Sequence, residues 1–409
     1  MRVLFNGASA IRPKTGVGHT TAQLHRALVT AYPDHCFWLY PGERVRQWAT
    51  RFYRPAAPAT GRGSPAPAPP RPDSDSWPQR LARRLARAGY AAHFHALARL
   101  GRFDLYHEPN LVPFRVPLPT VVTVHDLSVI LYPHWHPADR VRRYEQAFAR
   151  GIATAAHILV DSDAVRDEAL RLLGLAPERV TTVPCGINPA FRPQPPGSVA
   201  AVRRRLGLPP RYLLYVGTVE PRKNVGTLLR AFCDLPAELR DACPLVLGGA
   251  WGWKSEPERE FFEAVARHRG VRYLGYVADD DLPGLYTGAE ALFYPSHYEG
   301  FGLPPIEMMA CGGAAVVSTA AAVREVVGPN APLLEPGDLA GWREAMQRTI
   351  TDRDYLAPYR QAARATAARF SWANAARLTF ATYQAVLGLG GPSASLGSPP
   401  RSDSDRAAA

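Results

Sequence analysis

The stretch Ser296-His297-Tyr298-Glu299-Gly300-Phe301-Gly302-Leu303-Pro304-Pro305-Ile306-Glu307-Met308-Met309-Ala310 follows the apolar run Ala291–Tyr294. The run predicts a buried strand, and the glycines allow a tight turn in which the backbone can approach a ligand. The prolines suit the first turn of a helix, whose free N–H groups can hold a diphosphate. Glu299 and Glu307 can then face the same ligand, where carboxylates accept hydrogen bonds from sugar hydroxyls. A helix-capping glutamate in an ordinary loop would explain either residue alone, but not the whole stretch.

A second stretch, Gly217-Thr218-Val219-Glu220-Pro221-Arg222-Lys223-Asn224, follows the apolar run Tyr212–Val216. If that run is a parallel strand, the turn at Gly217 places two adjacent cations at the carboxyl edge of a sheet, where such folds bind ligands. Arg222 and Lys223 can neutralise the charge that develops on a departing diphosphate. Asn224 is expected to be the N-cap of the helix that begins at the next residue.

Two further candidate sites lie in the first half of the chain. His125 and Asp126 lie at the tip of the expected strand Thr120–His125, where site residues gather in parallel sheets. Orienting the loop would explain Asp126 as well. Gly16 and Gly18 follow the first apolar run and are expected to let a loop approach phosphate or acceptor, with a plain tight turn as the alternative. The third glycine of a dinucleotide fingerprint is missing, which excludes an NAD signature.

Short apolar runs alternate with helix-length segments along almost the whole chain. This pattern predicts an α/β fold of βαβ units with parallel sheets buried on both faces. Besides those already named, the expected strands are Val3–Asn6, Phe37–Tyr40, Leu105–His107, Ile158–Asp161, Val180–Val183, Pro244–Leu247, Val271–Leu274 and Ala314–Ser318.

Proline and glycine positions predict the domain boundaries. At 409 residues the chain is expected to hold more than one domain. We expect an N-terminal domain at 1–185, a linker at 186–210, a C-terminal domain at 211–370, a crossover helix at 371–389, and disordered segments at 54–77 and 390–409.

The net charge, the cysteines and the lengths of the apolar stretches indicate the partners and the cellular compartment. The net charge of +12 favours an anionic partner: a phosphorylated substrate, a membrane surface or a nucleic acid. Five scattered cysteines without a CxxC pair indicate neither a disulfide framework nor a zinc site, so a reducing cytoplasm is expected. No signal peptide or transmembrane stretch is evident.

The first stretch resembles the retaining glycosyltransferases of family 4, which have the GT-B fold: two Rossmann-like domains with parallel sheets that face each other across a cleft. The family context E-G-F-G-L-P-x-x-E-A-M-A-x-G is matched at Glu299, Gly300, Phe301, Gly302, Leu303, Pro304, Glu307, Met309, Ala310 and Gly312. Met308 and Gly313-Ala314 depart from it. The second stretch resembles the donor-phosphate loop of mannosyltransferase-like members, although much of the family has Arg where Thr218 stands.

The resemblance implies roles for individual residues. It implies that Glu307 holds the nucleotide ribose, and that His125, of the H-D-L motif, contacts the transferred sugar. Catalytic residues would be His125, Glu299, Arg222 and Lys223; residues that bind the nucleotide sugar would be Glu307, Gly300, Phe301, Gly302, Leu303, Gly217, Gly16 and Gly18.

The implied activity is retaining transfer of a hexose, most simply mannose from GDP-mannose, to a glycan or lipid-linked acceptor in polysaccharide biosynthesis. No cofactor or metal is implied, and Asp279-Asp280-Asp281 is interpreted as a helix cap. The alternatives are a UDP-sugar transferase of the glucose type, a nucleotide-sugar epimerase, and a basic nucleic-acid-binding protein, for which no base-reading motif is found.

The segment Gln79–Arg102 bears on where the protein works. It contains Arg80, Arg83, Arg84, Arg87, Arg99 and Arg102, no acidic residue, and leucines at helical spacing. Charge of one sign on an amphipathic helix favours peripheral contact with an anionic membrane over an ordinary domain helix. We therefore expect a cytoplasmic protein that can lie on the inner face of a membrane.

Overall fold

The computed structural model describes residues 1–10, 16–42 and 77–389. The segments expected to be disordered, 54–77 and 390–409, lie outside this part except for Trp77, which begins a helix. Residues 11–15 of the first loop also lie outside it.

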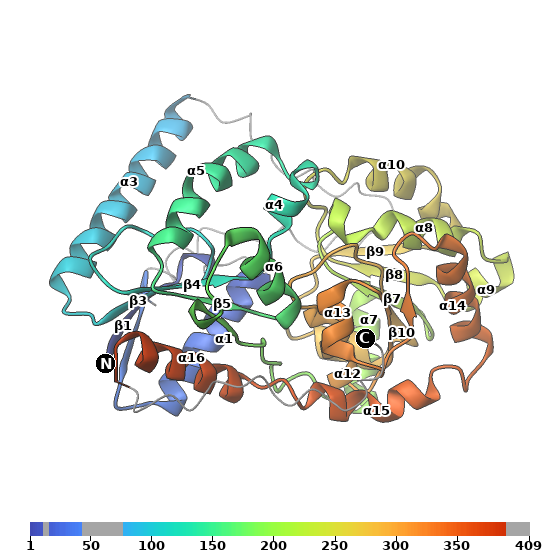
Figure 1. Ribbon diagram of the computed structural model, residues 1–409. Coiled ribbons are helices and arrows are strands. Elements are labelled where there is room, and N and C mark those ends of the chain that lie inside the picture. Colours follow the sequence, from blue (N-terminus) through green and yellow to red (C-terminus); the bar gives the residue numbers. More distant parts are fainter. Residues whose placement is uncertain (11–15, 43–76, 390–409) are drawn as a thin grey trace.

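Two parallel sheets form the framework, one in each half of the chain (Figure 1). The first has the strand order β2-β1-β3-β4-β5-β6 and the second β12-β11-β10-β7-β8-β9. The strands are β1 Arg2–Asn6, β2 Cys36–Tyr40, β3 Leu105–Glu108, β4 Thr120–Val124, β5 His157–Val160, β6 Val180–Thr182, β7 Leu213–Val216, β8 Leu245–Gly248, β9 Arg272–Gly275, β10 Ala291–Tyr294, β11 Ala315–Ser318 and β12 Leu333–Leu334. Each run expected to be a strand is one, and among the described residues the two-residue β12 is the only strand that was not predicted.

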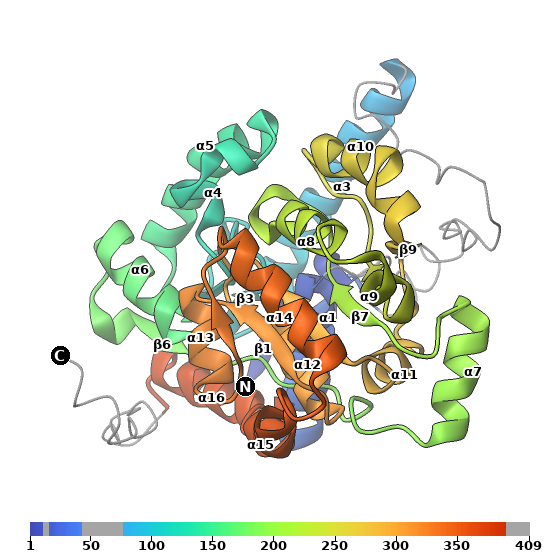
Figure 2. The same cartoon turned by 90° about the vertical axis from the view of Figure 1, so that its right-hand side faces the viewer.

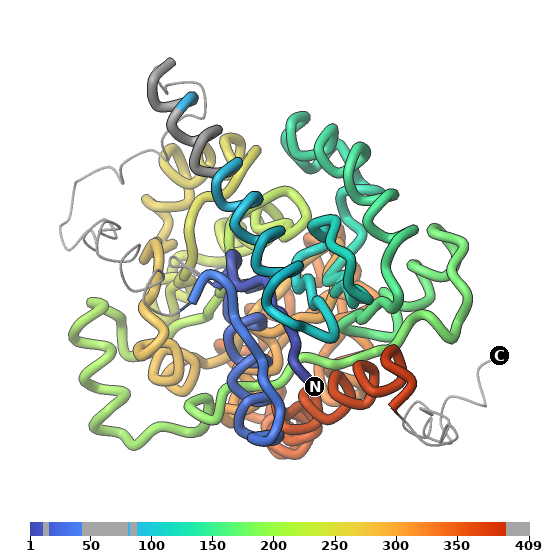
Figure 3. Tube along the Cα trace, turned by 90° about the vertical axis from the view of Figure 1, so that its left-hand side faces the viewer, coloured from blue at the N-terminus to red at the C-terminus, as the bar shows by residue number. Residues whose placement is uncertain are grey.

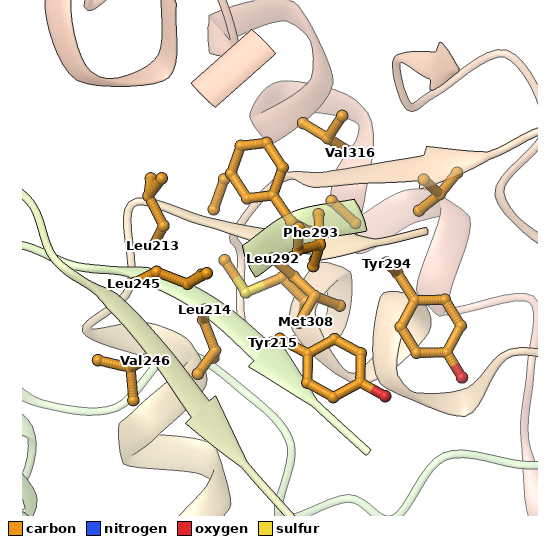
Figure 4. Close-up of a cluster of buried hydrophobic side chains, with 14 of the residues drawn as sticks. Leu213, Leu214, Tyr215, Leu245, Val246, Leu292, Phe293, Tyr294, Met308 and Val316 are labelled. Carbon is orange, nitrogen blue, oxygen red and sulfur yellow. The ribbon is translucent and has the colours of Figure 1, made fainter. Parts of the chain in front are cut away.

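The sheets are buried on both faces because helices cover them, as the continuous apolar strands require. Every residue of β4, β8, β10 and β11 is buried. Figure 4 shows the centre of the second core, where Leu292 and Phe293 of β10 lie among Leu214, Val316 and Met308.

The longer helices fill the intervals between strands (Figure 1). In the first half they are α1 Gly16–Ala31, α3 Trp77–Leu100, α4 Ser128–Leu131, α5 Ala138–Thr154 and α6 Asp163–Leu173. In the second half they are α7 Pro196–Leu206, α8 Val225–Cys233, α9 Ala237–Ala242, α10 Glu256–Ala264, α11 Leu282–Thr287, α12 Leu303–Ala310, α13 Ala321–Val327, α14 Leu339–Thr351, α15 Ala357–Ala367 and α16 Trp372–Val386.

The segment expected to be a linker, 186–210, contains the helix α7 (Figure 2). Pro196 occupies the first turn of α7, where a missing N–H costs nothing. The buried Val202 packs closely against Gly284 of α11. This helix is therefore part of the layer around the second sheet.

The last described helix, α16, packs against α1 in the first half of the molecule (Figure 3). Its Tyr383 is fully buried, and the hydroxyl lies 2.5 Å from Nδ1 of His107 on β3. The chain therefore returns from the second sheet to the first before it ends.

The arginine-rich segment forms α3, but the side chains of Arg80, Arg83, Arg84 and Arg87 lie outside the described part. Near its end α3 is anchored by Phe94 and Ala98, which are buried, whereas Leu100 is 81% exposed. Among the described residues, no helix combines the length and the apolarity that a bilayer crossing requires.

Candidate functional site

Glu299 is the centre of a buried charged cluster at the carboxyl edge of the second sheet. The neighbouring strands β7 and β10 end there, so the loops that follow them bring together residues about seventy positions apart in sequence. Glu299 accepts hydrogen bonds from Arg222 at 2.6 Å, from Tyr294 and Ser296 at 2.7 Å each, and from Lys223.

These contacts determine which groups are charged. Burial alone would raise the pKa of Glu299, but the charges of Arg222 and Lys223 outweigh it and lower the pKa to about 2. Burial lowers the pKa of Lys223, and the adjacent Arg222 lowers it further. Arg222 also pairs with Glu220 at 2.6 Å, so two cations and two carboxylates balance in the cluster. An entering diphosphate would compete with these carboxylates for the cations.

Asn224 occupies the N-cap position of α8, as predicted. Its side chain makes no capping hydrogen bond, and its backbone is left-handed with φ of 54°. The amide instead donates to the carbonyls of Pro295 and Pro336. It therefore ties together the loops that carry Arg222 and Glu299.

Glu307 lies on α12, apart from the charged cluster. It accepts a hydrogen bond from the Tyr286 hydroxyl at 2.9 Å. Burial raises its pKa to about 7, and the negative charge of Asp279 also raises it. Near neutral pH this carboxyl is thus only partly ionised, which suits a group that changes its hydrogen bonds when a ligand arrives.

The glycines of the two motifs form turns, whereas the apolar residues after Glu299 pack in the core. Gly302 begins α12 with φ of 112°, and Gly217 has φ of 153°, conformations that glycine tolerates. Phe301 is buried edge-to-face against Phe370, and Leu303 packs on the same core. Any ligand contact from Phe301 would therefore come from its backbone, because its side chain belongs to the core.

The interpretation of Asp279, Asp280 and Asp281 as a helix cap is confirmed for the position of Asp281, but not for a capping side chain. Asp281 is at the N-cap position of α11 but makes no capping hydrogen bond, because its carboxylate pairs with Arg205 of α7. Asp279 lies 3.6 Å from His19 of the first half. In the described part of the chain, no group of three or more His, Cys, Asp or Glu side chains is arranged to hold a metal ion.

His125 lies at the tip of β4, with both ring nitrogens engaged by acceptors. Nδ1 is 2.7 Å from Asp161, and Nε2 is 2.9 Å from the carbonyl of Pro109. Burial lowers its pKa, but the Asp161 charge and these hydrogen bonds outweigh burial and raise it above the ordinary value. Two acceptors favour the doubly protonated imidazolium. A sugar contact through its nitrogens would require one of these bonds to exchange.

The loop after β4 meets the glutamate loop of the other half. A Cβ atom on Gly300 would collide with the carbonyl oxygen of His125. The Ser162 hydroxyl donates to the Gly300 carbonyl at 2.8 Å, while Ser162 also caps α6. Asp126 accepts from the backbone and hydroxyl of Ser128, so it orients the loop, as its alternative reading predicted.

More contacts hold the two halves together around this point. The carboxylate of Glu325 on α13 accepts hydrogen bonds from the backbone N–H groups of Asp163 and Ala164, 2.9 Å each, at the start of α6. The Tyr298 hydroxyl donates to Glu168 at 2.6 Å. The loop after β4 and the glutamate loop of the other half are therefore held against each other at the interface.

The glycines of the first loop begin α1. Gly16 is its first residue, with open space around it, and Gly18 is buried. His19, next to Gly18, faces Asp279 across the interface. The structure thus places this helix start near the Glu307 side of the site, because the charge of Asp279 also acts on Glu307.

Several residues at the site were missed from the sequence. Glu220 and Ser296 stand within the quoted stretches and could have been expected as charge and hydrogen-bond partners of Arg222 and Glu299. Tyr286 lies on α11, 21 residues before its partner Glu307, and nothing in the sequence around it indicates that it belongs to the site.

Comparison with known proteins finds matches in both halves of the chain. The family model described as Glycosyltransferase Family 4 matches residues 15–191, and that described as Glycosyl transferases group 1 matches residues 201–366. The chain is 36% identical over 282 residues to O-antigen chain mannosyltransferase B of Escherichia coli, which covers 68% of this chain and 74% of that protein.

Two other matches cover different shares of the two chains compared. The serotype-specific mannosyltransferase WbdA of Escherichia coli is 30% identical over 281 residues, which are 66% of this chain but 34% of that longer protein. The crystal structure of Anabaena HepE in complex with UDP-glucose has a TM-score of 0.66 at 20% identity, covering 94% of this chain and 100% of that one. That likeness shows the GT-B fold.

Proposed function

The chain belongs to the glycosyltransferases of group 1 and family 4, and from this membership we propose that it transfers mannose, with retention, from GDP-mannose. The acceptor in this proposal is a glycan or a lipid-linked glycan in polysaccharide biosynthesis. The choice of mannose is supported by the relatives whose names describe mannosyltransferases. The observation that carries the proposed chemistry is the buried cluster of Arg222, Lys223 and Glu299 at the sheet edge.

The cluster suggests how the leaving group would be stabilised. In the proposed front-face reaction, the bond from the sugar C1 to the diphosphate oxygen breaks while the acceptor oxygen bonds to C1 on the same face. The acceptor proton passes to the departing phosphate oxygen, so no side chain need act as a strong base. Lys223 is buried and Arg222 is largely so, and ion pairs with Glu220 and Glu299 hold them in place before the leaving group forms. Charges fixed in this way stabilise a developing anion most effectively.

The donor is tested by incubating the protein with a panel of nucleotide sugars and following slow hydrolysis. We expect GDP-mannose to be consumed faster than UDP-glucose. The alternative, a UDP-sugar transferase of the glucose type, is favoured by nothing in the site itself, and faster consumption of UDP-glucose would establish it in place of the mannose proposal.

The two glutamates are expected to differ in their effects on binding. Glu307→Ala should weaken binding of free GDP about 10- to 100-fold, if its carboxylate accepts from the ribose hydroxyls. Glu299→Ala should not weaken it, because removing this carboxylate frees Arg222 and Lys223 for the diphosphate, yet transfer should be lost. Calorimetry with GDP separates the two, and the reverse pattern would contradict the assignment.

The raised pKa of Glu307 predicts that both GDP affinity and protein stability depend on pH. With its pKa near 7, GDP affinity should increase as pH rises through 7, because the ionised form is the better acceptor. The stability of the free protein should change the opposite way. Its folded pKa is above the ordinary 4.5, so the folded chain retains a proton that the unfolded chain releases, and stability falls from about pH 4.5 to 7. Both dependences should flatten in Glu307→Gln, as calorimetry and thermal unfolding across pH would show.

We propose that transfer needs no metal ion, since arginine, lysine and helix N-termini can offset the charge of the diphosphate. Turnover should therefore continue at an unchanged rate in EDTA. Complete loss of turnover that manganese restores would refute this proposal.

A further inference from the structure

Tyr294 brings a phenol hydroxyl from the core of the second half into the charged cluster. It is the last residue of β10, it is fully buried, and its ring stacks on that of Tyr215 with 6.2 Å between the ring centres (Figure 4). Its hydroxyl lies 2.6 Å from Nζ of Lys223 and 2.7 Å from a carboxylate oxygen of Glu299. A side chain with no exposed surface does not touch a ligand, so any effect of Tyr294 on a reaction passes through these two partners.

The charges of the two partners set the direction of both hydrogen bonds. An ammonium only donates and a carboxylate only accepts, whereas a phenol hydroxyl can do both. Burial raises the pKa of Tyr294 well above its ordinary value, and the charge of Glu299 raises it further, so the phenol keeps its proton. That proton is donated to Glu299, and the oxygen of Tyr294 accepts from Lys223.

The two acceptors of Lys223 respond differently to an entering diphosphate. Lys223 donates to Tyr294 and to Glu299, and no other acceptor for its ammonium is found in the described part of the chain. An ammonium has three N–H donors, so one is left for a ligand. A diphosphate repels Glu299, because both are anions, and competes with it for the ammonium. Tyr294 is neutral, so its hydrogen bond to Lys223 can persist when the diphosphate is bound.

We propose that Tyr294 is a positioning residue of the transfer reaction: its hydroxyl holds the ammonium of Lys223 in place while the diphosphate of the donor displaces Glu299. The inference rests on the proposed function and deepens it, because it explains how Lys223 stays aligned when its counter-ion changes. Without the hydroxyl, only Glu299 and the ligand would hold the ammonium, and its position relative to the leaving oxygen would be less well defined.

The first test is the kinetics of Tyr294→Phe, which removes only the hydroxyl. Full-length proteins are compared with the nucleotide sugar that the wild type hydrolyses fastest, so that the result does not depend on GDP-mannose being the donor. We expect kcat to fall about 10- to 100-fold, the usual effect of losing a hydrogen bond to a charged group. The KM should stay within about threefold, because Tyr294 does not touch the donor.

A double-mutant cycle tests whether Tyr294 acts through Lys223. If it does, its hydroxyl has no further role once the lysine is removed. Tyr294→Phe introduced into the Lys223→Ala protein should therefore lower kcat by less than about twofold more. Two residues that act independently would give losses that multiply.

The pH profile of kcat reports on the charge of Lys223 itself. The charged and titratable groups around it are Glu220, Arg222, Tyr294 and Glu299, and Asp126 of the first half acts on Arg222. Burial lowers the pKa of Lys223 and Arg222 lowers it further, whereas a hydrogen bond accepted from the ammonium favours the charged form. The alkaline limb, where Lys223 loses its proton, should therefore move about one pH unit lower in Tyr294→Phe.

Tyr212→Phe is the matched control for the loss of a buried hydroxyl. Tyr212 belongs to the same core and is fully buried, and its hydroxyl donates to the carbonyl of Leu285 at 2.7 Å, away from the charged cluster. Both tyrosine variants should have a lower unfolding temperature, because each loses a buried hydrogen bond. Only Tyr294→Phe should change kcat and move the alkaline limb.

The outcomes separate the inference from the proposed function. A wild-type chain that consumes no nucleotide sugar would refute the function, and this inference with it. With an active wild type, an unchanged kcat in Tyr294→Phe, losses that multiply in the cycle, or an alkaline limb that does not move would each overturn the inference alone. Failure of Tyr294→Phe to fold, while Tyr212→Phe folds, would give the hydroxyl a structural role and would also overturn it.

Discussion

Replacing Lys223 with alanine is expected to lower kcat about 10²- to 10³-fold, the usual effect of removing one group that stabilises developing negative charge. The ammonium is buried and hydrogen-bonded to Tyr294 and Glu299, so it is fixed in place before the leaving group forms. No other cation in the described cluster except Arg222 can substitute, and Arg222 is already shared between Glu220 and Glu299.

The unfolding temperature of Lys223→Ala shows whether the lower kcat comes from lost charge stabilisation or from a damaged fold. Glu299 keeps Arg222, Tyr294 and Ser296 as partners, so the fold should persist, with a lower unfolding temperature because one buried ion pair is broken. Arg267→Ala, which removes an exposed ion pair with Glu263, is the matched control and should affect neither property. Near-normal kcat in a folded Lys223→Ala protein would remove this loop from the mechanism.

Gly300→Ala is expected to lower kcat/KM about 100-fold or more by preventing the two halves from meeting, since even a 1 Å displacement at an active site can cost that much. The backbone of Gly300 is not in the left-handed region, so alanine is compatible with the loop itself. The groups in the way lie across the interface: the carbonyl of His125, with whose oxygen the new Cβ would collide, and the Cβ of Asp126 at 3.1 Å. The second core should therefore fold normally while the interface opens.

Small-angle scattering and kinetics together test this expectation. The Gly300→Ala protein should have a larger radius of gyration than the wild type, with unchanged helix content by circular dichroism. Gly337→Ala is the matched control, because a Cβ there meets open space. Wild-type activity and compactness in Gly300→Ala would show that the contact with His125 is not needed for function.

The fold was predictable because each strand is a short apolar run between helix-length segments, a pattern that parallel sheets buried on both faces impose locally. The sequence alone could not decide the role of a residue that has two possible uses. Pro196 can end a segment or begin a helix, and Asp281 can cap a helix or pair with a distant arginine. Only the tertiary neighbours, Gly284 and Arg205, decide between the two uses.

The site was predictable to the extent that its chemistry lies in contiguous motifs. Arg222, Lys223 and Glu299 could be expected to meet because they follow strands that end at one edge of a sheet. The engagement of His125 by Asp161 and Pro109 could not be predicted, because it depends on the side chains of two neighbouring loops.

The central claim is retaining transfer of mannose from GDP-mannose, and the anomeric configuration of the first-formed product tests it most directly. Proton NMR is recorded immediately after the wild-type protein is mixed with GDP-α-mannose, before the released sugar equilibrates between its anomers. The account predicts that GDP-mannose is consumed and that α-mannose, or an α-mannoside when a pyranoside acceptor is present, appears first. Initial release of the β-anomer, or no consumption of GDP-mannose under conditions in which UDP-glucose is consumed, would contradict it.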